Sequence, residues 1–393
     1  MWNRQELDKL YSDVLPKLSS EAFCLSDYIA AHPEIGEHEF ESSKRLVNTL
    51  RSHGIEVEYP FCGMETAFKA QINKTAPRRF ALLAEYDALR GIGHGCGHCA
   101  SGTATILTAL ALNSAIADAD VGVDVIGTPD EEINGAKCVM ADQGVFKDYD
   151  FVAMAHMGAN NSADVKFMAL DGTTIEFLGV AAHAAQAPEQ GRNALNAARL
   201  FMDATDMMRQ HIIQEARLHG YIVNGGTASN IVPDHTVIEF LSRAPSRKDL
   251  TYITEWVYDC ARAAALATKT KCEIKPCGHP FDDLFMTAAE HELMQECFDD
   301  LGMKTVSGGA TSGSSDIGNV SYICPAFHPY ISIGQNFQVH TTEFAQAMTD
   351  ERTHTAILNA AKYLLMLAFK LYGDPGRLER IKQEHKECLK NPH

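Results

Sequence analysis

The chain has 393 residues, of which 46% are apolar and 22% are charged. This composition is typical of a globular protein with a sizeable core and excludes a disordered or fibrous chain. The length predicts two or three domains. Lys and Arg number 34 and Asp and Glu 51, so the formal net charge is −17. That charge repels phosphate groups and argues against nucleic acid or an anionic membrane as a partner.

The chain carries no sign of a membrane span or a secretion signal. No apolar run approaches the roughly 18 residues that a span needs. Residues 1–23 carry charges throughout and lack the apolar segment of a signal peptide. Most of the 11 cysteines stand alone in apolar stretches, which indicates reduced thiols. We therefore expect a cytoplasmic protein in which a Cys beside a His is a candidate metal ligand.

Helical and β-rich segments alternate in the first part of the chain. Residues 41–54 have helical periodicity that stops at Gly54, as a helix should. Short β-rich runs follow at 80–86, 121–127 and 150–156, and residues 100–119 between the first two are rich in helix formers. This alternation predicts an α/β sheet covered by helices on both faces.

The middle of the chain has a different order. The predicted elements are a strand at 173–179, a helix at 193–216, strands at 221–225 and 235–243, a helix at 249–269 and a strand at 271–276. This β-α-β-β-α-β order is the ferredoxin-like unit. A strand at 330–334 and a helix at 352–372 then resume the first pattern. We therefore predict an α/β domain made of residues 1–171 and 279–393, interrupted by an inserted α+β domain at 172–278.

Potential metal ligands cluster at the carboxyl ends of the predicted strands, where open α/β sheets build their sites. The motif GHGCGHCASG (93–102) follows the first strand, PDEE (129–132) follows the second, and two histidines end or follow later strands. The candidates are Cys96, His98, Glu131, Glu132, His156 and His340. Thiolate, imidazole and carboxylate together suit Zn²⁺ or a similar metal.

Each of these features also has an alternative interpretation. Cys96 and Cys99 have the C-x-x-C spacing of a redox pair. The cluster could instead be a structural zinc site, although such sites are usually closed by four Cys or His without adjacent carboxylates. Glu131 and Glu132 could be a solvated loop pair, and His156 an ordinary buried histidine. Residues alone leave these alternatives open.

Taken together, the motifs resemble the M20 family of metallopeptidases and amidohydrolases. The similarity lies in the branch with a Cys-Gly-His signature, which includes p-aminobenzoyl-glutamate hydrolase subunits and auxin-conjugate hydrolases. It runs through HPEIGEHEF (32–40), LAEYDALRGIGHGCGHCASGTA, GTPDEE, GVAAHAAQAPEQGRNALNA, NGGTASNIVPD, GSSDIGNVSYICPAFHP and HTTEF. The resemblance implies a mixed-sheet, zinc-exopeptidase-like catalytic domain with an inserted ferredoxin-like lid and dimerisation domain.

The resemblance also implies a metal site and a general base. The implied ligands are Cys96, His98, Glu132, His156 and His340. Five protein ligands with a bridging water imply two divalent metal ions, Zn²⁺ first, with Mn²⁺, Co²⁺ or Ni²⁺ as alternatives. Glu131 resembles the general base. Asp87 resembles the acid that orients a ligand imidazole, and its alternative is a turn-capping role.

The inserted domain is expected to supply further groups. His183 resembles the lid histidine that stabilises an oxyanion, often across a dimer. Asn230 and Arg243 resemble groups that hold a substrate carboxylate, although Arg243 could be a mere surface charge. The Gly-rich segment 307–318 lacks the Lys of a P-loop, which argues against phosphate binding, and by resemblance it lines the cleft near Asp316.

Two positions depart from the family pattern. Position 99 is Cys where relatives mostly have Asn or Asp, and Arg90 replaces an expected Pro. Neither change removes a ligand. We therefore expect a metal-dependent hydrolase of small N-acyl or aminoacyl amino acids. The inserted sheet has an outer edge strand that could pair with a second copy, so we expect a homodimer or a higher homo-oligomer. The competing classes are a non-catalytic metal-binding protein and a thiol redox protein that uses Cys96 and Cys99.

Overall fold

The computed structural model describes residues 3–116, 119–307, 313–334 and 337–390. The helices are α1 (Arg4–Lys9), α2 (Leu15–Ala31), α3 (Phe40–Ser52), α4 (His98–Asn113), α5 (Ala136–Asp142), α6 (Ala194–Met208), α7 (Arg247–Thr268), α8 (Ala288–Asp300), α9 (Ile317–Ser321), α10 (Thr342–Gln346), α11 (Glu351–Gly373) and α12 (Pro375–Cys388). The strands are β1 (Glu56–Glu58), β2 (Phe68–Ile72), β3 (Arg78–Ala84), β4 (Val121–Gly127), β5 (Val152–Ala153), β6 (His156–Gly158), β7 (Ala169–Leu178), β8 (Arg217–Asn224), β9 (His235–Ala244), β10 (Lys271–Pro276), β11 (Ala326–Phe327) and β12 (Tyr330–Ser332).

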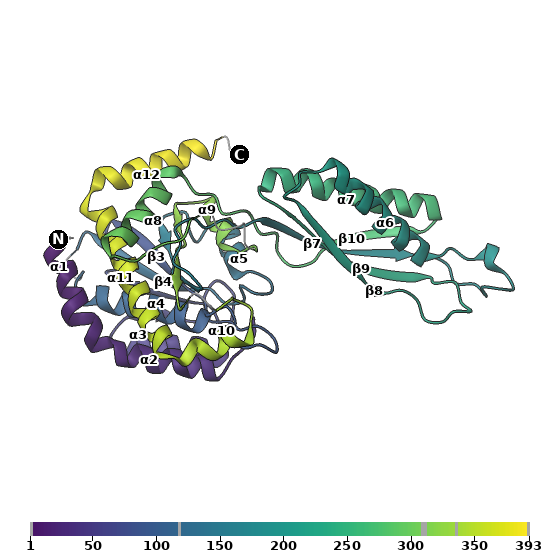
Figure 1. Ribbon diagram of the computed structural model, residues 1–393. Helices are drawn as coiled ribbons and strands as arrows, with labels where there is room; N and C mark the ends of the chain where they lie inside the picture. Colours follow the sequence, from purple (N-terminus) through teal and green to yellow (C-terminus); the bar gives the residue numbers. More distant parts are fainter. Residues whose placement is uncertain (1–2, 117–118, 308–312, 335–336, 391–393) are drawn as a thin grey trace. The chain divides into compact units, whose positions relative to one another are not determined.

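The chain forms two compact units (Figure 1). Unit 1 comprises residues 1–166, 284–312 and 319–392, and unit 2 comprises residues 167–283 with 313–318. The predicted insert at 172–278 therefore falls within unit 2. No helix in the described ranges combines the length and apolar character that crossing a bilayer requires.

Unit 1 is built on a mixed sheet of six strands in the order β1-β2-β4-β3-β5-β11. The strands β4, β3, β5 and β11 run parallel to one another, whereas β2 is antiparallel to both β4 and β1. The central strand β4 is buried along its whole length, as expected for a strand covered on both faces. Helix α4 is buried from His98 to Leu112 and packs between α2 and α11. The predicted α/β class is confirmed.

Unit 2 is a four-stranded antiparallel sheet in the order β10-β7-β9-β8, with α6 and α7 packed against one face. Along β9 every second residue is buried, including Ile238 and Phe240, because one face of the sheet meets the helices. The chain order β7-α6-β8-β9-α7-β10 is the predicted ferredoxin-like order. Ser246 caps the start of α7 by accepting a hydrogen bond from the Asp249 amide.

Two predicted elements differ clearly from the observed ones. The helix predicted at 193–216 ends at Met208, and a 3-10 turn over Arg209–His211 follows it before β8 begins at Arg217. The strand predicted at 150–156 is two short strands, β5 and β6, which belong to different sheets. His156 therefore begins β6 and pairs with Tyr330 of β12, rather than ending the previous strand. Residues 117–118 of the helix predicted at 100–119 lie outside the described residues.

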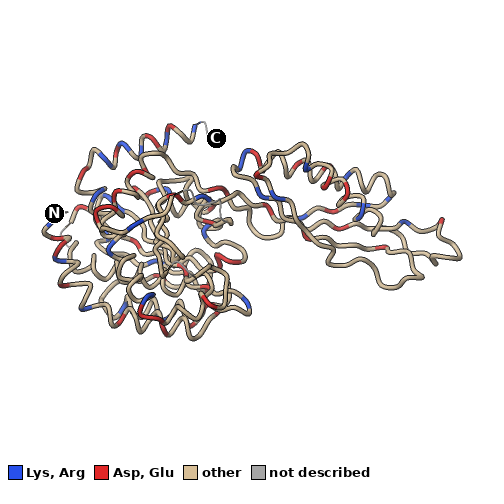
Figure 2. Tube along the Cα trace, viewed as in Figure 1, with Lys and Arg blue, Asp and Glu red and all other residues tan. Residues whose placement is uncertain are grey.

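Opposite charges alternate along the surface helices. Figure 2 shows Lys and Arg interleaved with Asp and Glu along α12, for example. Several of these charges form exposed pairs such as Arg4 with Asp8 and Arg262 with Asp259. Exposed pairs of this kind contribute little to the free energy of unfolding, on the order of 0–1 kcal/mol each.

Candidate metal centre

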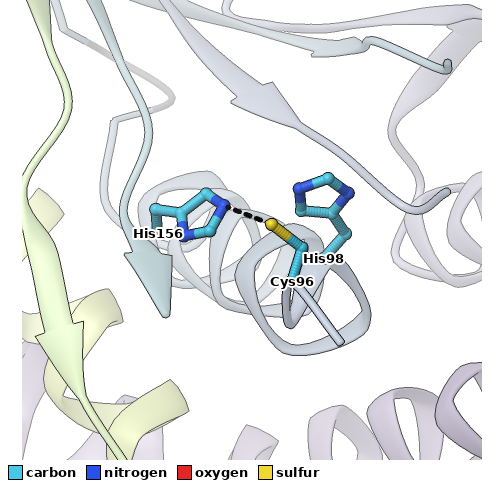
Figure 3. Close-up of side chains that lie close together, drawn as sticks. All are labelled: Cys96, His98 and His156. Atoms are coloured by element: carbon cyan, nitrogen blue, oxygen red, sulfur yellow. Dashed lines mark hydrogen bonds between the residues drawn. The ribbon is translucent and has the colours of Figure 1, made fainter. Parts of the chain in front are cut away.

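The first two candidate ligands flank a glycine at the start of α4. Gly97 has a φ of 80° and precedes His98, the first residue of the helix. A Cβ at position 97 would lie 2.9 Å from the Cβ of Met157. Both the left-handed backbone and the close approach therefore require glycine. This turn presents the Cys96 thiol and the His98 imidazole to the same side (Figure 3).

All five predicted metal ligands lie within one cluster in unit 1. Ligand atoms of Cys96, His98 and His156 lie within 4.8 Å of one another, as do those of Cys96, Glu132 and His340. The Cys96 Sγ atom lies 3.7 Å from His156 Nε2 and 3.4 Å from His340 Nε2. The thiol is thus shared by two three-residue groups, which is an arrangement that fits two adjacent cations.

Glu131 joins the same cluster from a neighbouring position. Its carboxylate lies within 4.8 Å of ligand atoms of both His98 and Glu132. Glu131 and Glu132 follow β4, and Cys96 and His98 follow β3, and these two strands are parallel neighbours. Parallel strands bring their carboxyl ends to the same edge of a sheet, which explains why residues about 35 positions apart in sequence meet here.

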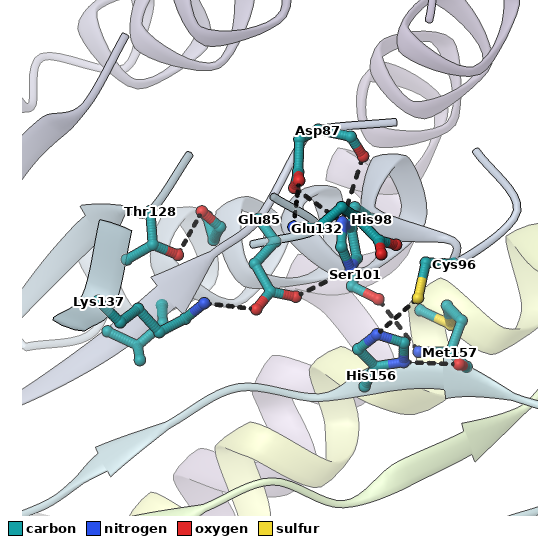
Figure 4. Close-up of polar contacts among 12 residues, drawn as sticks. Glu85, Asp87, Cys96, His98, Ser101, Thr128, Glu132, Lys137, His156 and Met157 are labelled. Atoms are coloured by element: carbon teal, nitrogen blue, oxygen red, sulfur yellow. Dashed lines mark hydrogen bonds and ion pairs between the residues drawn. The ribbon is translucent and has the colours of Figure 1, made fainter. Parts of the chain in front are cut away.

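Backbone and carboxylate groups orient the candidate ligands (Figure 4). Asp87 Oδ1 lies 2.8 Å from His98 Nδ1, and Asp87 Oδ2 accepts a hydrogen bond of 2.9 Å from the Glu132 amide. His156 Nδ1 lies 2.7 Å from the Met157 carbonyl, which sets that nitrogen as the donor. The Nε2 atom of His156 is then the acceptor that faces Cys96.

A buried ion pair that sequence reasoning missed lies behind His98. Glu85 Oε2 is 3.3 Å from His98 Nε2, and Glu85 Oε1 accepts a hydrogen bond of 2.6 Å from Lys137 Nζ of α5. All three side chains are buried. Burial raises the pKa of Glu85, but Lys137 and His98 outweigh that effect and lower it to about 2. The available signals were an acid at the end of an apolar strand and a Lys inside an apolar helix.

The loop at HPEIGEHEF supports the turn that carries the two glutamates. Asp130 has a φ of 60° and donates its amide to Glu39 Oε1 at 2.7 Å. A Cβ at Gly36 would overlap the Asp130 carboxylate, so this motif approaches the turn closely only with glycine there. Burial, together with the nearby Asp87 charge, raises the pKa of Glu39 to about 8.

Burial dominates the electrostatics of the cluster. It raises the pKa of Cys96 well above its usual value and, together with His98, lowers that of His156 to about 3. Burial also lowers the pKa of His98, but Asp87 and Glu85 outweigh it and raise the value well above normal. A divalent cation would reverse this for the thiol, because metal ligands bind in their deprotonated forms.

The donor set fits such cations. His98 Nε2 and Glu132 Oε1 are buried and make no hydrogen bond to any residue in the described ranges; their contacts are the ion pairs with Glu85 at 3.3 Å and His340 at 3.8 Å. Buried polar atoms are otherwise almost always hydrogen-bonded. Thiolate, imidazole and carboxylate donors converging on one point are the ligands of zinc-like metals.

The three candidates in the predicted insert lie in unit 2, at two ends of one strand. The His183 loop and the Asn230 loop are adjacent, since the Ala184 amide donates to the Asn230 carbonyl at 2.9 Å. Arg243 lies near the other end of β9, where its guanidinium donates to Ser314. The strand between them spans roughly 25 Å. A single chain therefore does not bring Asn230 and Arg243 to one substrate carboxylate.

Of the remaining predicted features, the Gly-rich segment 307–318 is only partly described. Residues 308–312 lie outside the described residues, and Asp316 is buried within unit 2. Arg90 is exposed on the loop after β3.

Comparison with known proteins identifies the family. A family model named peptidase dimerisation domain, of the M20 family, matches residues 169–269. The Xaa-Arg dipeptidase of Mus musculus is 34% identical over 379 residues, covering 92% of this chain and 88% of that protein. The chain belongs to the M20 family. It is accordingly a hydrolase of amide or peptide bonds, and the resemblance inferred from its motifs is confirmed.

Other M20 relatives match along nearly the whole chain. One of the p-aminobenzoyl-glutamate hydrolase subunits of Escherichia coli is 27% identical over 462 residues, covering 98% of this chain and 95% of that protein. A dinuclear metal-binding M20 peptidase from Bacillus subtilis superposes with a TM-score of 0.63 at 18% identity, covering 89% of this chain and 99% of that one. The last similarity establishes that the two share the M20 fold.

The unusual Cys99 of this M20 protein is not part of the ligand cluster. Its side chain is buried in the core of unit 1 near Ser26 of α2. Burial raises the pKa of the Cys99 thiol to about 12. A thiol that stays protonated is a poor nucleophile. The raised pKa of Cys99 therefore argues against the redox interpretation of the C-x-x-C spacing.

Proposed function

We propose that this protein hydrolyses the amide bond of small aminoacyl or N-acyl amino acids, and that a dipeptide with a basic C-terminal residue is its preferred substrate. The observation that carries the reaction is Glu131, a carboxylate placed beside a cluster of five metal-binding side chains. The substrate class is supported by the name of the mouse relative, an Xaa-Arg dipeptidase. The net charge of −17 also favours a substrate with a cationic group.

Two divalent ions would be held by Cys96, His98, Glu132, His156 and His340. The shared thiol favours Zn²⁺ over harder cations, because soft sulfur ligands select zinc. When bound, such ions lower the pKa of water and polarise a carbonyl group. The side chain of His340 is 55% exposed, whereas the other candidate ligands are largely buried. We therefore place the open, substrate-facing side of the centre at His340.

Glu131 acts as the general base and then as the general acid. It accepts a proton from the attacking water and donates it to the leaving amine. Asp87 accepts a hydrogen bond from the backbone amide of Glu132. This bond fixes the turn that carries both glutamates, with Glu132 as metal ligand and Glu131 as base. His183 stabilises the oxyanion: its Nδ1 atom accepts from the Ala185 and Gln186 amides. The proton of a neutral His183 is then on Nε2, ready to donate.

We also propose that residues 172–278 form a lid and dimerisation domain and that the active site is shared across a homodimer. Two observations support this: the match to a peptidase dimerisation domain, and the position of the His183–Asn230 loops at the far end of β9 from Arg243. In a dimer, His183 and Asn230 of one subunit would work with Arg243 of the partner subunit, which would hold the substrate carboxylate. Arg243 Nε makes no hydrogen bond to any described residue, so it retains a donor for that carboxylate.

All 11 cysteines are free, and this supports the proposal of a cytoplasmic enzyme with reduced thiols. The sequence left two other functions open, a non-catalytic metal-binding protein on the same fold and a thiol redox protein, and membership of the M20 family argues against both. The variant Cys99→Ala separates a thiol redox protein from a hydrolase. A hydrolase should retain most of its activity, and a dithiol enzyme should lose all of it.

The deciding experiment is a substrate panel. The metal-depleted protein is assayed with Ala-Arg, Ala-Leu, Ala-Glu and N-acetyl amino acids, before and after addition of Zn²⁺, Mn²⁺ or Co²⁺. We expect hydrolysis only after metal addition, with Ala-Arg the fastest. The variant Glu131→Gln is the matched control for a contaminating peptidase. Absence of hydrolysis with every metal and peptide would contradict the proposal.

A further inference from the structure

A cavity of about 300 Å³ lies in unit 1 beside the metal-binding cluster. Two of its lining residues touch or adjoin candidate ligands. The Tyr330 ring packs against the His156 ring, with centroids 5.2 Å apart at 72°, and Val339 directly precedes His340. Tyr330 and Val339 thus connect the lining of the cavity to the candidate ligands His156 and His340.

The walls of the cavity suit an alkyl stem. Val165 is buried, Val306 and Val339 are exposed hydrophobic residues, and Tyr330 supplies an aromatic face. Exposed apolar side chains that line a concave site are typical of ligand pockets. A side chain of several methylene groups would cover them.

The cavity carries one acid among its lining residues, Asp164, whose side chain is 23% exposed. The loop that bears it is fixed to the core. Asn161 accepts from the Ser332 amide and donates to the Lys304 carbonyl, and the Asp164 amide donates to Ser162 Oγ. Asp164 is thus a carboxylate on a braced loop rather than a mobile surface charge.

Lys166 forms a long ion pair with this acid. Its ammonium group lies 3.9 Å from Asp164 Oδ1, at the outer limit of an ion pair, and the Lys166 side chain is 62% exposed. An exposed pair at that distance is weak. An ionised carboxylate has about four acceptor sites, so a guanidinium or ammonium group that enters the cavity could bind the exposed part of the Asp164 side chain through a charge-assisted hydrogen bond, in addition to the contacts that Asp164 already makes.

We propose that Asp164 determines specificity by binding the cationic side chain of the substrate's C-terminal residue in this cavity. The inference rests on the proposed dipeptidase function and adds to it the recognition residue. The apolar walls would contact the methylene stem, and the carboxylate would pair with its charged end.

The test compares Arg with citrulline, which has nearly the same size and shape but no charge. Values of kcat and KM are measured for Ala-Arg and Ala-citrulline with the wild type, Asp164→Asn, Lys166→Ala and Glu56→Gln. Glu56 is an exposed acid outside the cavity lining, and its substitution removes the same charge. Metal content is measured for each variant to show that the centre is intact.

We expect Asp164→Asn to raise KM for Ala-Arg by roughly tenfold while leaving Ala-citrulline within about twofold. Lys166→Ala should leave or increase the preference for Arg, and Glu56→Gln should not change it. The proposal is overturned if Asp164→Asn affects both peptides equally, or if Glu56→Gln changes the preference as much.

A binding measurement keeps this inference separate from the catalytic proposal. Free L-arginine and L-citrulline are titrated calorimetrically into the zinc-loaded protein. Their amino and carboxyl groups are identical, so a difference reports the side chain. Tighter binding of arginine that is lost in Asp164→Asn supports the subsite even if no peptide is cleaved, a result that would contradict only the proposed function. Equal binding of the two ligands by the wild type, or binding of neither, overturns the subsite.

Discussion

The carboxylate of Asp87 lies 2.8 Å from the Nδ1 atom of His98, at the base of the metal-binding cluster. Its second oxygen accepts the Glu132 amide, so one side chain orients two candidate ligands. Both Asp87 and His98 are buried. Because both side chains are buried, the protein rather than solvent fixes their relative position. A substitution of Asp87 therefore tests directly whether the cluster binds metal.

Replacing Asp87 should weaken metal binding without removing a ligand. We expect Asp87→Asn to lower Zn²⁺ affinity by about 10–100-fold, the usual cost of losing a residue that orients a ligand histidine. Competition with a chromogenic chelator measures this. The control is Asp124→Asn, a buried acid of β4 bonded to Tyr149, which should reduce stability but not metal affinity. Equal metal affinity in the wild type and Asp87→Asn would contradict this role.

The buried Glu85–Lys137 ion pair should matter for the stability of the folded protein only while both charges are present. Lys137→Met leaves the buried Glu85 carboxylate with only the His98 imidazole beside it. Removing one partner of a buried ion pair typically costs about 3–5 kcal/mol of the free energy of unfolding. The double variant Lys137→Met with Glu85→Gln should recover much of this loss, because no uncompensated charge remains. Denaturant unfolding of the three variants measures the effect. A double variant no more stable than Lys137→Met would contradict this explanation.

Glu39 should make the protein less stable as the pH rises. Its pKa is about 8 in the folded protein and about 4.3 in an unfolded chain. Between these values the folded state holds the extra proton, so the free energy of unfolding falls with increasing pH. The total effect is on the order of 5 kcal/mol, at about 1.4 kcal/mol per pKa unit. Glu39→Gln should flatten the stability profile between about pH 5 and 8.

The control for this measurement is Glu56→Gln, since Glu56 is exposed and its substitution should leave the slope of the profile unchanged. Denaturant midpoints at several pH values give both profiles. Parallel profiles for the wild type and Glu39→Gln would mean that Glu39 is ionised at neutral pH in the folded protein.

The sequence predicted the positions of some site residues correctly and of others incorrectly, because the predictions were based on different kinds of pattern. The convergence of Cys96, His98 and Glu132 followed from strand order, because β3 and β4 are parallel and end at the same edge. His156 was expected at the end of a strand and instead begins β6. Periodicity identifies β-rich segments, but it does not show where a chain leaves one sheet for another.

Two other features lay beyond the sequence. Glu85 and Lys137 are 52 positions apart, and an acid in a strand and a base in a helix carry no sign that they are partners. The family resemblance implied that Asn230 and Arg243 both hold a substrate carboxylate. The intervening strand β9 places them at opposite ends, which is a consequence of extended geometry that makes nearby residues distant.

The proposal that the active site is shared between two subunits predicts complementation between inactive variants. Mixing His183→Ala with Glu131→Gln should restore activity if each site combines residues of two subunits, since some mixed dimers hold one intact site. The recovered activity is limited by the fraction of mixed dimers. If subunit exchange is shown independently and no activity returns, His183 acts within its own subunit or not at all.

The most direct measurement of the central claim is a comparison of Glu131→Gln with Glu132→Gln for both metal content and turnover of Ala-Arg. Glu131→Gln should keep the wild-type amount of metal and lose about 10²–10⁴-fold in kcat, the usual contribution of a general base. Glu132→Gln should lose metal. Full activity in Glu131→Gln, or full metal content in Glu132→Gln, would contradict the division of roles between these two adjacent carboxylates.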